Sequence, residues 1–462
     1  MIKAYYQDNL ITELHGHVIS VLQEMPSESV HCIVTSPPYW GLRDYNLEPQ
    51  IWDGEDGCVH EWKDNTYTRN TDLTAGAKQK TNIGAIGRDE PVKNSFCQKC
   101  GAWLGSLGLE PTPELYIQHI VQIWRELKRV LRKDGVCFLN IGDSYASSGK
   151  GNDGNEGYDD GRTNRTLRLG GRSVLGLKPK DLCMIPARVA LALQKDGWWL
   201  RSDIIWEKSN PMPESCTDRP TNSYEHIFLL TKLGKYFYDA DAVREEGTGR
   251  NWAKSGGNLM GQGIHKLNDG FTDIGDRSNR EDVTGRNLRN VWTIATEPTP
   301  EAHFATFPQE LVKKCILAGT SEKGCCPECG APWVRVVEKP QIPRDDIYEG
   351  SKFKNSDENF SHKRIQKMVV AGRKAGLPHD NPIPQSKTIG WKPSCSCGNK
   401  TYTTQYKRRP LPSIPCTVLD PFSGSGKTLI VSKKYGRKSI GIDLKQEYLE
   451  MPLRKVAQEK LF

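Results

Sequence analysis

The sequence predicts an α/β fold built on a mostly parallel sheet. Apolar strand patterns alternate with helical patterns along much of the 462-residue chain, which is the rhythm of βαβ units. Near the C-terminus, a strand pattern runs into a glycine-rich turn and then a helix. Two polar segments that carry cysteines interrupt the rhythm, so we expect two insertions in the fold.

The N-terminal elements are a strand, a helix and a second strand. Lys3 to Tyr6 suits a short strand, and Ile11 to Leu22 suits a helix. Residues 30–35 (Val-His-Cys-Ile-Val-Thr) form an apolar run that ends at two prolines, which predicts a buried strand leading into a stiff turn. Residues 46–111 then break the pattern, and we interpret them as an inserted metal knuckle.

The clearest helix follows this insertion. Thr112 can cap its N-terminus and Pro113 fits its first turn. Apolar residues then recur at helical spacing as far as Leu131, and residues 136–141 suit the next strand.

The rest of the chain continues the alternation, with a glycine-rich loop at 146–176 and a second insertion at about 324–410. The remaining helices are expected at 186–195, 308–318 and 427–435, and the remaining strands at 200–206, 225–231, 416–419 and 439–442. The predicted domains are a core (1–45, 112–240, 300–320 and 411–462), a knuckle (46–111), a candidate target-recognition segment (241–299) and a second zinc-binding insertion (321–410).

Composition indicates a soluble protein with a mildly basic surface. Charged residues make up 26% of the chain and the net charge is +8, which suits a polyanionic partner. No apolar run is long enough to span a membrane, and the N-terminus lacks the apolar region of a signal peptide. We therefore expect a cytoplasmic protein with no membrane partner.

The cysteines predict two structural zinc sites. Fourteen cysteines in a cytoplasmic chain favour metal binding over disulfides. Two sets have the residue types of tetrahedral zinc ligands, with no position left open for catalysis. They are Cys58, His60, Cys97 and Cys100, and Cys326, Cys329, Cys395 and Cys397. Cys325 is an alternative to Cys326, and a redox role for the Cys-x-x-Cys pairs is an alternative to metal binding.

Residues 418–428 (Val-Leu-Asp-Pro-Phe-Ser-Gly-Ser-Gly-Lys-Thr) have the form of a nucleotide-type site. Gly424 and Gly426 let the backbone approach a ligand, and the helix start offers free N–H groups. The end resembles a phosphate-binding loop, but Pro421 stands where that motif needs glycine. Asp443 ends the next strand, where an acid commonly binds ribose hydroxyls or else caps the following helix.

Residues 35–40 (Thr-Ser-Pro-Pro-Tyr-Trp) resemble the signature of enzymes that methylate exocyclic amino groups. Such a nitrogen is a poor nucleophile because its lone pair is delocalised into the ring. Hydrogen-bond acceptors on its protons would bend it towards sp³ geometry. The side chain of Ser36 and the carbonyl of Pro37 are candidate acceptors, Pro38 stiffens the turn, and Tyr39 offers a ring to stack on the base. Trp40 either extends that wall or packs beneath it.

Together the two motifs resemble the β-class DNA amino-methyltransferases, in which the catalytic motif precedes the cofactor motif. The resemblance covers the core and not the insertions. It implies a Rossmann-like fold with a permuted seven-stranded sheet, S-adenosylmethionine as cofactor, and direct transfer to a base flipped out of duplex DNA. No cysteine nucleophile is implied, and we expect Cys32 to be packed within its strand.

The resemblance also assigns residues to the site. The implied catalytic residues are Ser36, Pro37, Pro38 and Tyr39. The implied cofactor-binding residues are Asp8, Thr35, Phe307, Asp420, Pro421, Phe422, Gly424, Gly426 and Asp443. Asp8 follows Gln7 rather than the more usual glycine, so it is either a cofactor residue or a helix cap. Phe307 closes over the methionine end of the cofactor or belongs to the core.

In this family, serine at the position of Ser36 is typical of N4-cytosine enzymes, and an acid or asparagine there is typical of N6-adenine enzymes. We therefore expect N4-methylcytosine as the product, within restriction–modification or phage or host DNA modification, and a cognate restriction endonuclease as a possible partner. The alternatives are an N6-adenine enzyme, a zinc-stabilised DNA-binding protein with a vestigial cofactor site, and methylation of RNA or protein.

Clusters of basic residues are candidate contacts to DNA phosphates, although each could equally be a solvated face. They are Arg162, Arg165, Arg168 and Arg172; Arg277, Arg280, Arg286 and Arg289; Lys363, Arg364, Lys367, Arg373 and Lys374; and Lys407, Arg408 and Arg409.

Overall fold

A computed structural model describes most of the chain, and its described part falls into two compact units. The described residues are 3–42, 45, 47–67, 92–146, 177, 178, 180–214, 216–245, 286–297, 307–338, 387–397 and 411–459. The first unit comprises residues 1–243, 288–332 and 412–462, and the second comprises residues 244–287 and 333–411. The cysteine-bearing segment at 46–111 belongs to the first unit.

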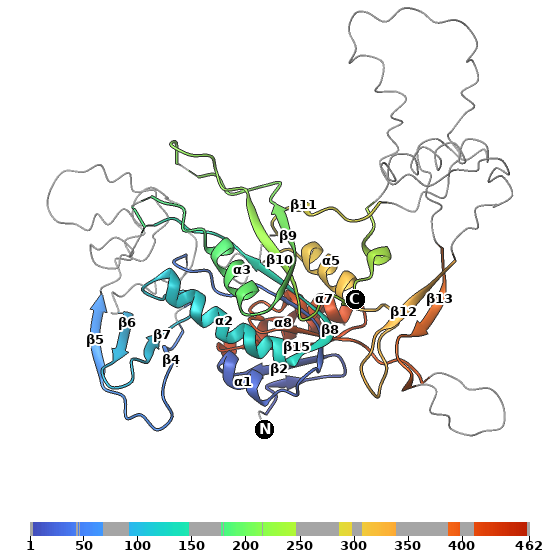
Figure 1. Ribbon diagram of the computed structural model, residues 1–462, viewed down its shortest axis with the longest axis horizontal. Helices are drawn as coiled ribbons and strands as arrows, with labels where there is room; N and C mark the ends of the chain where they lie inside the picture. The colour runs from blue at the N-terminus through green and yellow to red at the C-terminus, as the bar shows by residue number, and fades with distance from the viewer. Residues whose placement is uncertain are drawn as a thin grey trace, which may run out of the picture. The chain divides into compact units, whose positions relative to one another are not determined.

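The first unit is built on a mixed sheet in the order β1-β2-β15-β14-β3-β8-β10-β9-β11 (Figure 1). In that order the strands are Tyr6–Gln7, Ile11–His15, Lys438–Asp443, Thr417–Asp420, Val30–Thr35, Leu131–Ile141, Tyr224–Thr231, Trp199–Glu207 and Val291–Thr293.

The sheet has nine strands in the described residues rather than the seven expected. The short strands β1 and β11 add one strand at each edge. The run from β2 to β8 is parallel throughout. Strand β10 is antiparallel to both β8 and β9, and β1 is antiparallel to β2. The parallel run matters most for function, because its carboxyl ends all meet at one edge of the sheet.

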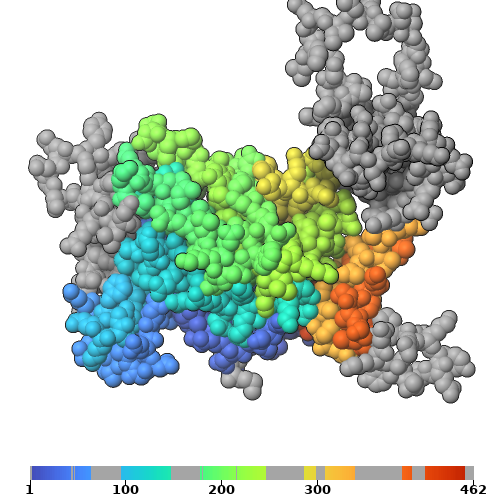
Figure 2. All heavy atoms as spheres, in the orientation of Figure 1, coloured from blue at the N-terminus to red at the C-terminus, as the bar shows by residue number. Residues whose placement is uncertain are grey.

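Helices cover both faces of this sheet. On one face lie α1 (Val18–Glu24), α2 (Pro113–Val130) and α3 (Ile185–Lys195), which share a hydrophobic cluster with β3 and β8. On the other lie α5 (Gln309–Gly319) and α7 (Lys427–Lys434), with α8 (Gln446–Glu459) beside α7 and the short helix η1 (Ala240–Val243) beside α5. In the space-filling view, α2 and residues 185–230 form one continuous surface (Figure 2).

The predicted helix at residues 11–22 is wrong in its first half. Residues 11–15 form β2, which pairs in parallel with β15 from Ile11 opposite Ser439 to His15 opposite Asp443. Burial alternates along β2, as a strand requires, and the helix begins only at Val18. The long helix α2 agrees with its prediction, since Thr112 Oγ1 accepts a hydrogen bond from the Leu115 N–H at 3.2 Å.

The insertion at 46–111 folds as a four-stranded antiparallel sheet in the order β4-β7-β6-β5. The strands are β4 (Gln50–Trp52), β7 (Trp103–Gly105), β6 (Val92–Cys97) and β5 (Trp62–Tyr67). Trp52 and Trp103 are buried in the same hydrophobic cluster as α2, so this small sheet is anchored to the core of the first unit.

In the second unit, the described residues include an antiparallel pair, β12 (Trp333–Glu338) and β13 (Lys387–Pro393). The guanidinium of Arg335 lies 4.5 Å from the centre of the Trp391 ring, across this pair. Of the basic residues proposed to contact DNA, only Arg286 and Arg289 are described, and the others lie outside the described residues.

Within the described part of the chain, no helix combines the length and the apolar character needed to cross a bilayer.

Candidate active site

Strands β3 and β14 are neighbours in the sheet and bring the two sequence motifs together. Cys32 and Ile33 pair with Val418 and Leu419, so both strands end at the same edge. There the hydroxyl of Thr35 donates a hydrogen bond to Asp420 Oδ1 at 2.8 Å, and both side chains are buried. A hydrogen bond therefore joins the two sequence motifs directly, although 385 residues separate Thr35 and Asp420 in the chain.

Asp420 organises the start of the glycine-rich turn. Besides Thr35, the Thr428 hydroxyl donates to Asp420 Oδ2 at 2.7 Å, and the Phe422 N–H donates to Oδ1 at 3.1 Å. Burial raises the pKa of Asp420 to about 6, and these three donors act in the opposite direction. The carboxyl group thus forms hydrogen bonds with the end of β3, with the turn and with helix α7.

The two glycines of the turn have different neighbours. Gly424 has φ +48°, and a Cβ there would meet only the Phe422 carbonyl oxygen, at 3.9 Å. That leaves room beside the backbone for a ligand. Gly426 has φ +70°, and a Cβ there would lie 2.0 Å from Cγ of Pro452 in α8. The need for glycine at 426 therefore comes from packing inside the protein.

Asp443 joins the glycine turn to the end of β15. Its Oδ2 accepts the Gly424 N–H and its Oδ1 accepts the Lys445 N–H, each at 2.9 Å. Burial raises the pKa of Asp443 to about 6. Lys427, which would bind phosphate in a phosphate-binding loop, instead pairs with Glu297 at 3.1 Å.

The hydroxyl groups of the catalytic turn form a directed chain of hydrogen bonds. Ser36 Oγ donates to the Tyr39 hydroxyl at 3.0 Å, and that hydroxyl donates to Glu225 Oε2 at 2.7 Å. The Asn140 amide donates to both the Tyr39 hydroxyl and Glu225 Oε2, at 2.7 and 2.8 Å. Lys208 Nζ lies 2.6 Å from Glu225 Oε1. Strands β3, β8 and β10 thus supply one polar network.

One buried acceptor in this network has no partner. Asn140 is 3% exposed, and its Oδ1 receives no hydrogen bond from any described residue. A buried acceptor without a donor is costly in the absence of a ligand. Its place beside Ser36 and Tyr39 suits a substrate that brings its own N–H groups.

Two hydrogen bonds hold residues 38–40 against helix α2 and the segment before it. The Tyr116 hydroxyl, on α2, donates to the Pro38 carbonyl oxygen at 2.9 Å. Trp40 is buried and its Nε1 donates to the Glu110 carbonyl oxygen at 2.9 Å, so this ring packs beneath the turn. Cys32 is wholly buried within β3, and burial holds the pKa of its thiol well above the usual range, which does not suit a nucleophile.

A family profile described as DNA methylase (N6_N4_Mtase) matches residues 30–326 and 416–454, which include all of these groups. The chain belongs to the DNA methylase family. It is accordingly an S-adenosylmethionine-dependent DNA methyltransferase, and membership alone does not fix the methylated base.

Relatives support this membership. The chain is similar to the Type II methyltransferase M.Cfr9I of Citrobacter freundii, with 39% identity over 315 residues, 68% of this chain and 73% of that protein. It is also similar to the Type II methyltransferase M.SfiI of Streptomyces fimbriatus, with 27% identity over 452 residues, 94% of this chain and 88% of that protein.

Among solved structures, the PvuII DNA methyltransferase (cytosine-N4-specific) aligns with a TM-score of 0.43 and 12% identity, covering 97% of this chain and 86% of that one. A likeness this weak does not bear on the substrate of the present DNA methylase.

The structure separates Asp8 from the rest of the predicted cofactor site. Asp8 precedes β2 at the edge where Ile11 pairs with Ser439, whereas Asp443 lies at the other end of β15. Its Oδ1 accepts the N–H groups of Leu10 and Ile11, and Lys433 pairs with Oδ2 at 2.6 Å. Burial raises the pKa of Asp8, but these bonds outweigh it and lower the pKa to about 2. Asp8 is therefore a turn-stabilising residue and the cofactor prediction for it is wrong.

The structure also describes three other residues that were predicted to bind the cofactor. Pro421 and Phe422 belong to the turn after β14, and Phe422 packs partly buried against the core cluster. Phe307 precedes α5 and packs partly buried against the cluster on the other face of the sheet. Its contact with the cofactor remains a prediction.

The first cysteine set converges within the inserted sheet of the DNA methylase. The ligand atoms of Cys58, His60, Cys97 and Cys100 all lie within 4.8 Å of one another. Cys58 Sγ is 4.0 Å from Cys97 Sγ, and Cys100 Sγ is 3.4 Å from His60 Nδ1. The turn between the two later cysteines is closed by a bond from the Gly101 N–H to the Cys97 carbonyl at 2.9 Å. Soft sulfur and imidazole ligands in this number suit zinc.

The second predicted set is divided between the two units, with Cys326 and Cys329 in the first and Cys395 and Cys397 in the second. Its closure into one site therefore stays a prediction. The turn at Cys326 matches that at Cys97, because the Gly330 N–H donates to the Cys326 carbonyl at 2.8 Å. Cys325 does not replace Cys326, since it is buried with His31 and Cys416.

Sequence reasoning missed Glu225, the place of Asn140 in the hydrogen-bond network around Tyr39, and the side chains that hold residues 38–41. Glu225 lies 186 residues after Tyr39, and its motif, a glutamate at the start of an apolar strand, has no signal of its own. Glu225 lies near the site because the N-terminal end of β10 is next to the carboxyl end of β8 in an antiparallel pair. This pairing is known only once the order of strands in the sheet is known.

Proposed function

We propose that this DNA methylase transfers a methyl group to the exocyclic N4 of cytosine in duplex DNA, as the modification enzyme of a restriction–modification system. The observation that carries the proposal is the Thr35–Asp420 bond, which fixes the Ser-Pro-Pro-Tyr turn against the cofactor turn. Serine rather than an acid at position 36 favours cytosine. The names of the relatives as Type II methyltransferases support the biological setting.

The chain offers two acceptors for the two protons of an exocyclic amine. Ser36 Oγ donates its own proton to Tyr39, which leaves its lone pairs free to accept. Asn140 Oδ1 is buried and has no donor among the described residues. Two such bonds would direct the nitrogen lone pair out of the plane of the base. Because the target base must leave the duplex to reach them, we propose base flipping.

S-adenosylmethionine, when bound, supplies an electrophilic methyl group at a sulfonium. We propose that the turn from Asp420 to Gly426 and the carboxylate of Asp443 would hold it, with the positive end of the α7 dipole favouring a negatively charged group. The open space beside Gly424 and its position directly after the Thr35–Asp420 corner fit a ligand there.

Methylation leaves a proton to be removed from the nitrogen. Once the nitrogen carries the methyl group that the cofactor would supply, it would bear a positive charge, and its extra proton would pass to Ser36 Oγ. The Ser36 proton moves to the Tyr39 oxygen, and the Tyr39 proton moves to Glu225 Oε2, along bonds already aligned at 3.0 and 2.7 Å. Lys208 stays paired with the other oxygen of Glu225. No cysteine is needed, consistent with the buried thiol of Cys32.

We also propose that Cys58, His60, Cys97 and Cys100 bind a structural zinc ion. Their convergence in the described structure supports the site, and four protein ligands leave no position for a reacting water. Elemental analysis of the purified protein should find about one zinc per chain for this set, and about two if the second predicted set also binds. A Cys97→Ser, Cys100→Ser variant that keeps the full zinc content would contradict the first site.

The deciding experiment is a nucleoside digest of duplex DNA methylated with labelled cofactor, read by mass spectrometry. N4-methylcytosine is the expected product. N6-methyladenine would keep the enzyme class and overturn the base assignment. Absence of any methylated base on diverse genomic DNA, with cofactor binding intact, would favour RNA as substrate. Absence of cofactor binding would favour a zinc-stabilised DNA-binding protein.

A further inference from the structure

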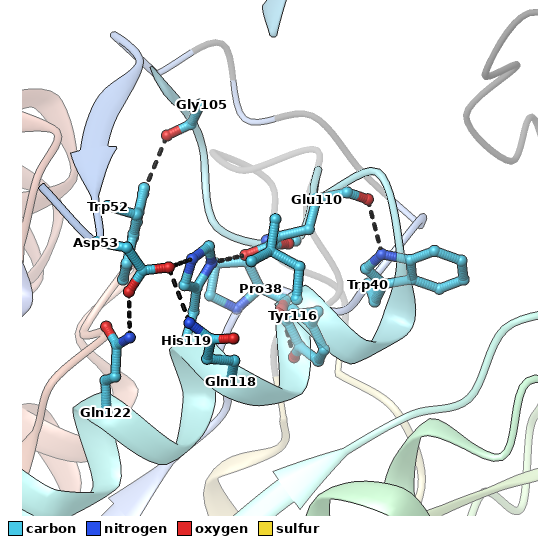
Figure 3. Close-up of polar contacts among 12 residues, drawn as sticks. Pro38, Trp40, Trp52, Asp53, Gly105, Glu110, Tyr116, Gln118, His119 and Gln122 are labelled. Carbon is cyan, nitrogen blue, oxygen red and sulfur yellow. Dashed lines mark hydrogen bonds and ion pairs between the residues drawn. The ribbon is translucent and has the colours of Figure 1, made fainter. Parts of the chain in front are cut away.

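An acidic residue at the end of a strand of the inserted sheet contacts helix α2. Asp53 directly follows β4, and its carboxylate lies 3.2 Å from His119 Nε2 and accepts a hydrogen bond from the Gln118 amide at 3.0 Å (Figure 3). It also accepts a hydrogen bond from Gln122. Asp53 has φ +58°, a left-handed conformation that costs a non-glycine residue about 1 kcal/mol. Asp53 therefore holds three side chains of α2 from a strained position in the insertion.

His119 connects Asp53 to a second carboxylate, that of Glu110. Its side chain is wholly buried between two tryptophans of the insertion, with ring centres at 4.6 Å to Trp52 and 5.3 Å to Trp103. Its Nδ1 lies 2.9 Å from Glu110 Oε1. A neutral imidazole has only one N–H, so two carboxylate neighbours require one further proton on the ring or on a carboxyl group. The three side chains form one hydrogen-bonded bridge.

Glu110 connects this bridge to the catalytic turn. Its Oε2 accepts the Gly108 N–H at 2.8 Å, and its carbonyl oxygen accepts from Trp40 Nε1 at 2.9 Å. The Gly108 carbonyl in turn accepts the Gly41 N–H at 2.9 Å. One helical turn before His119, the Tyr116 hydroxyl holds the Pro38 carbonyl. Figure 3 shows Glu110 beside His119, and Tyr116 of α2 beside Pro38.

A purely stabilising role accounts poorly for this arrangement. Buried ionic groups seldom add net stability over apolar residues of the same shape, because removing the charges from water is costly. What such groups supply is a fixed geometry, since each donor must meet its acceptor. The geometry fixed here is that of residues 38–41, which follow Ser36 and Pro37.

We propose that Asp53, His119 and Glu110 are positioning residues, through which the cysteine-bearing insertion sets the geometry of the catalytic Pro38–Tyr39 turn. The role is catalytic only through the turn, and it rests on the proposed function in that this turn holds the target base. A displacement of the turn by about 1 Å can cost on the order of 100-fold in rate.

The test compares variants of His119 and Glu110 in the full-length protein. His119→Phe keeps a ring between the two tryptophans and removes both hydrogen bonds. We expect kcat for DNA methylation to fall about 10- to 100-fold, with the Kd for S-adenosylmethionine unchanged, because Asp53, His119 and Glu110 have their described hydrogen bonds to groups outside residues 420–426. The control is Glu114→Gln on the same helix, whose exposed carboxylate pairs with Arg188. It should retain the wild-type kcat.

The double variant His119→Phe, Glu110→Gln separates positioning from stability. It removes the unpaired buried charge that His119→Phe leaves, so we expect its Tm to recover towards wild type while kcat stays low. Recovery of kcat together with Tm would overturn the proposal. Should the His119 variants fail to fold, Asp53→Asn and Asp53→Ala replace them. Asparagine can still accept from His119 and should retain most of kcat, whereas alanine should not.

Hydrogen–deuterium exchange provides a readout that does not depend on the substrate. The peptide containing residues 36–42 should lose protection in His119→Phe and Asp53→Ala and keep it in Glu114→Gln. Unchanged protection in all three would overturn the positioning role. If the wild type methylates no DNA while protection changes as expected, the proposed function fails and the bridge stands.

Discussion

Glu13 has a buried carboxyl group with no hydrogen-bond partner among the described residues. It lies in the middle of β2 and is wholly buried, and neither oxygen has a hydrogen-bond partner among the described residues. Burial, with a smaller contribution from Asp443, raises its pKa to about 8. In the unfolded chain a glutamate titrates near 4.5, so folding favours the protonated form. The stability associated with Glu13 is complete below the unfolded pKa and is lost as the pH rises through about 8.

We predict that Glu13→Gln stabilises the protein at alkaline pH. Because glutamine is always neutral, the variant should gain Tm relative to wild type progressively as the pH rises from about 5 to about 8, and the gain should level off above about pH 8. Asp420 and Asp443, with pKa values of about 6, are present in both proteins, so their titration affects both stability curves and not mainly the difference between them. The measurement is thermal unfolding against pH, with the exposed Glu48→Gln as control. An equal gain at both ends of this pH range would contradict the titration of Glu13.

Tyr39 carries the only described link from Ser36 to Glu225, and Tyr39→Phe removes its hydroxyl while keeping the ring. We predict a fall in kcat of about 10- to 100-fold, because a relayed proton transfer is interrupted, with little change in the Kd for S-adenosylmethionine. Single-turnover methylation of duplex DNA measures the effect. A variant that methylates at the wild-type rate would show that the proton leaves by another route.

At the scale of single residues, the sequence predicts the chemistry of a side chain better than its neighbours in space. Ser36, Tyr39, Asp420 and Asp443 could be chosen from their motifs, because each motif is a short continuous segment. Glu225 could not, because its hydrogen bond with Tyr39 depends on the antiparallel pairing of β8 and β10. The roles predicted for the site residues in binding and catalysis stay predictions.

Among the secondary-structure elements, the predictions fail where tertiary pairing overrides a local pattern. Residues 11–15 carry apolar side chains compatible with either a helix or a strand, and pairing with β15 decides for the strand. The same misassignment explains the error at Asp8. Once β2 is a strand, Asp8 precedes it at the edge opposite the cofactor turn. Helix α2, with its cap, first-turn proline and long apolar stripe, is specified locally and agrees with its prediction.

The two glycines before helix α7, Gly424 and Gly426, are predicted to respond differently to substitution by alanine. Gly424→Ala meets little protein, so we expect a fall of about 1 kcal/mol in stability from the positive φ, and a large fall in affinity for S-adenosylmethionine. Gly426→Ala drives a methyl group into Pro452, so we expect a much larger fall in Tm. Thermal unfolding and calorimetric titration of the cofactor distinguish the two.

The double variant Gly426→Ala, Pro452→Ala tests the stated cause. If the clash with Pro452 sets the cost at position 426, the second change should restore part of the Tm. Equal Tm values for the single and double variants would show that backbone strain alone is responsible.

For the whole molecule, the permuted order of motifs has a simple structural basis. The cofactor strand β14 comes late in the chain but lies between β3 and β15, so its carboxyl end meets that of β3. A parallel sheet gathers strand ends at one edge whatever their order in the chain. The inserted segment 46–111 then supports this edge from beneath through Asp53 and His119. Motif order is visible in the sequence, whereas the link between insertion and turn depends on the fold.

The last prediction concerns the net charge of +8 and where it meets DNA. Replacing Arg162, Arg165, Arg168 and Arg172 by glutamine removes four positive charges and lowers the net charge from +8 to +4. If these residues neutralise phosphates, the slope of log K for DNA against log salt should become shallower by about 0.9 for each phosphate that is no longer neutralised. Affinity should fall for specific and non-specific DNA alike, because phosphate contacts carry no sequence information.

A control with the same net charge separates phosphate binding from general attraction. Replacing Lys3, Lys195, Lys434 and Lys438 by glutamine also lowers the charge from +8 to +4, and all four side chains are exposed. We expect this variant to keep nearly the wild-type salt slope, since dispersed charges act only through a field that salt screens. Equal slopes in both variants would mean that the arginine cluster binds no phosphate and that another basic cluster binds the DNA.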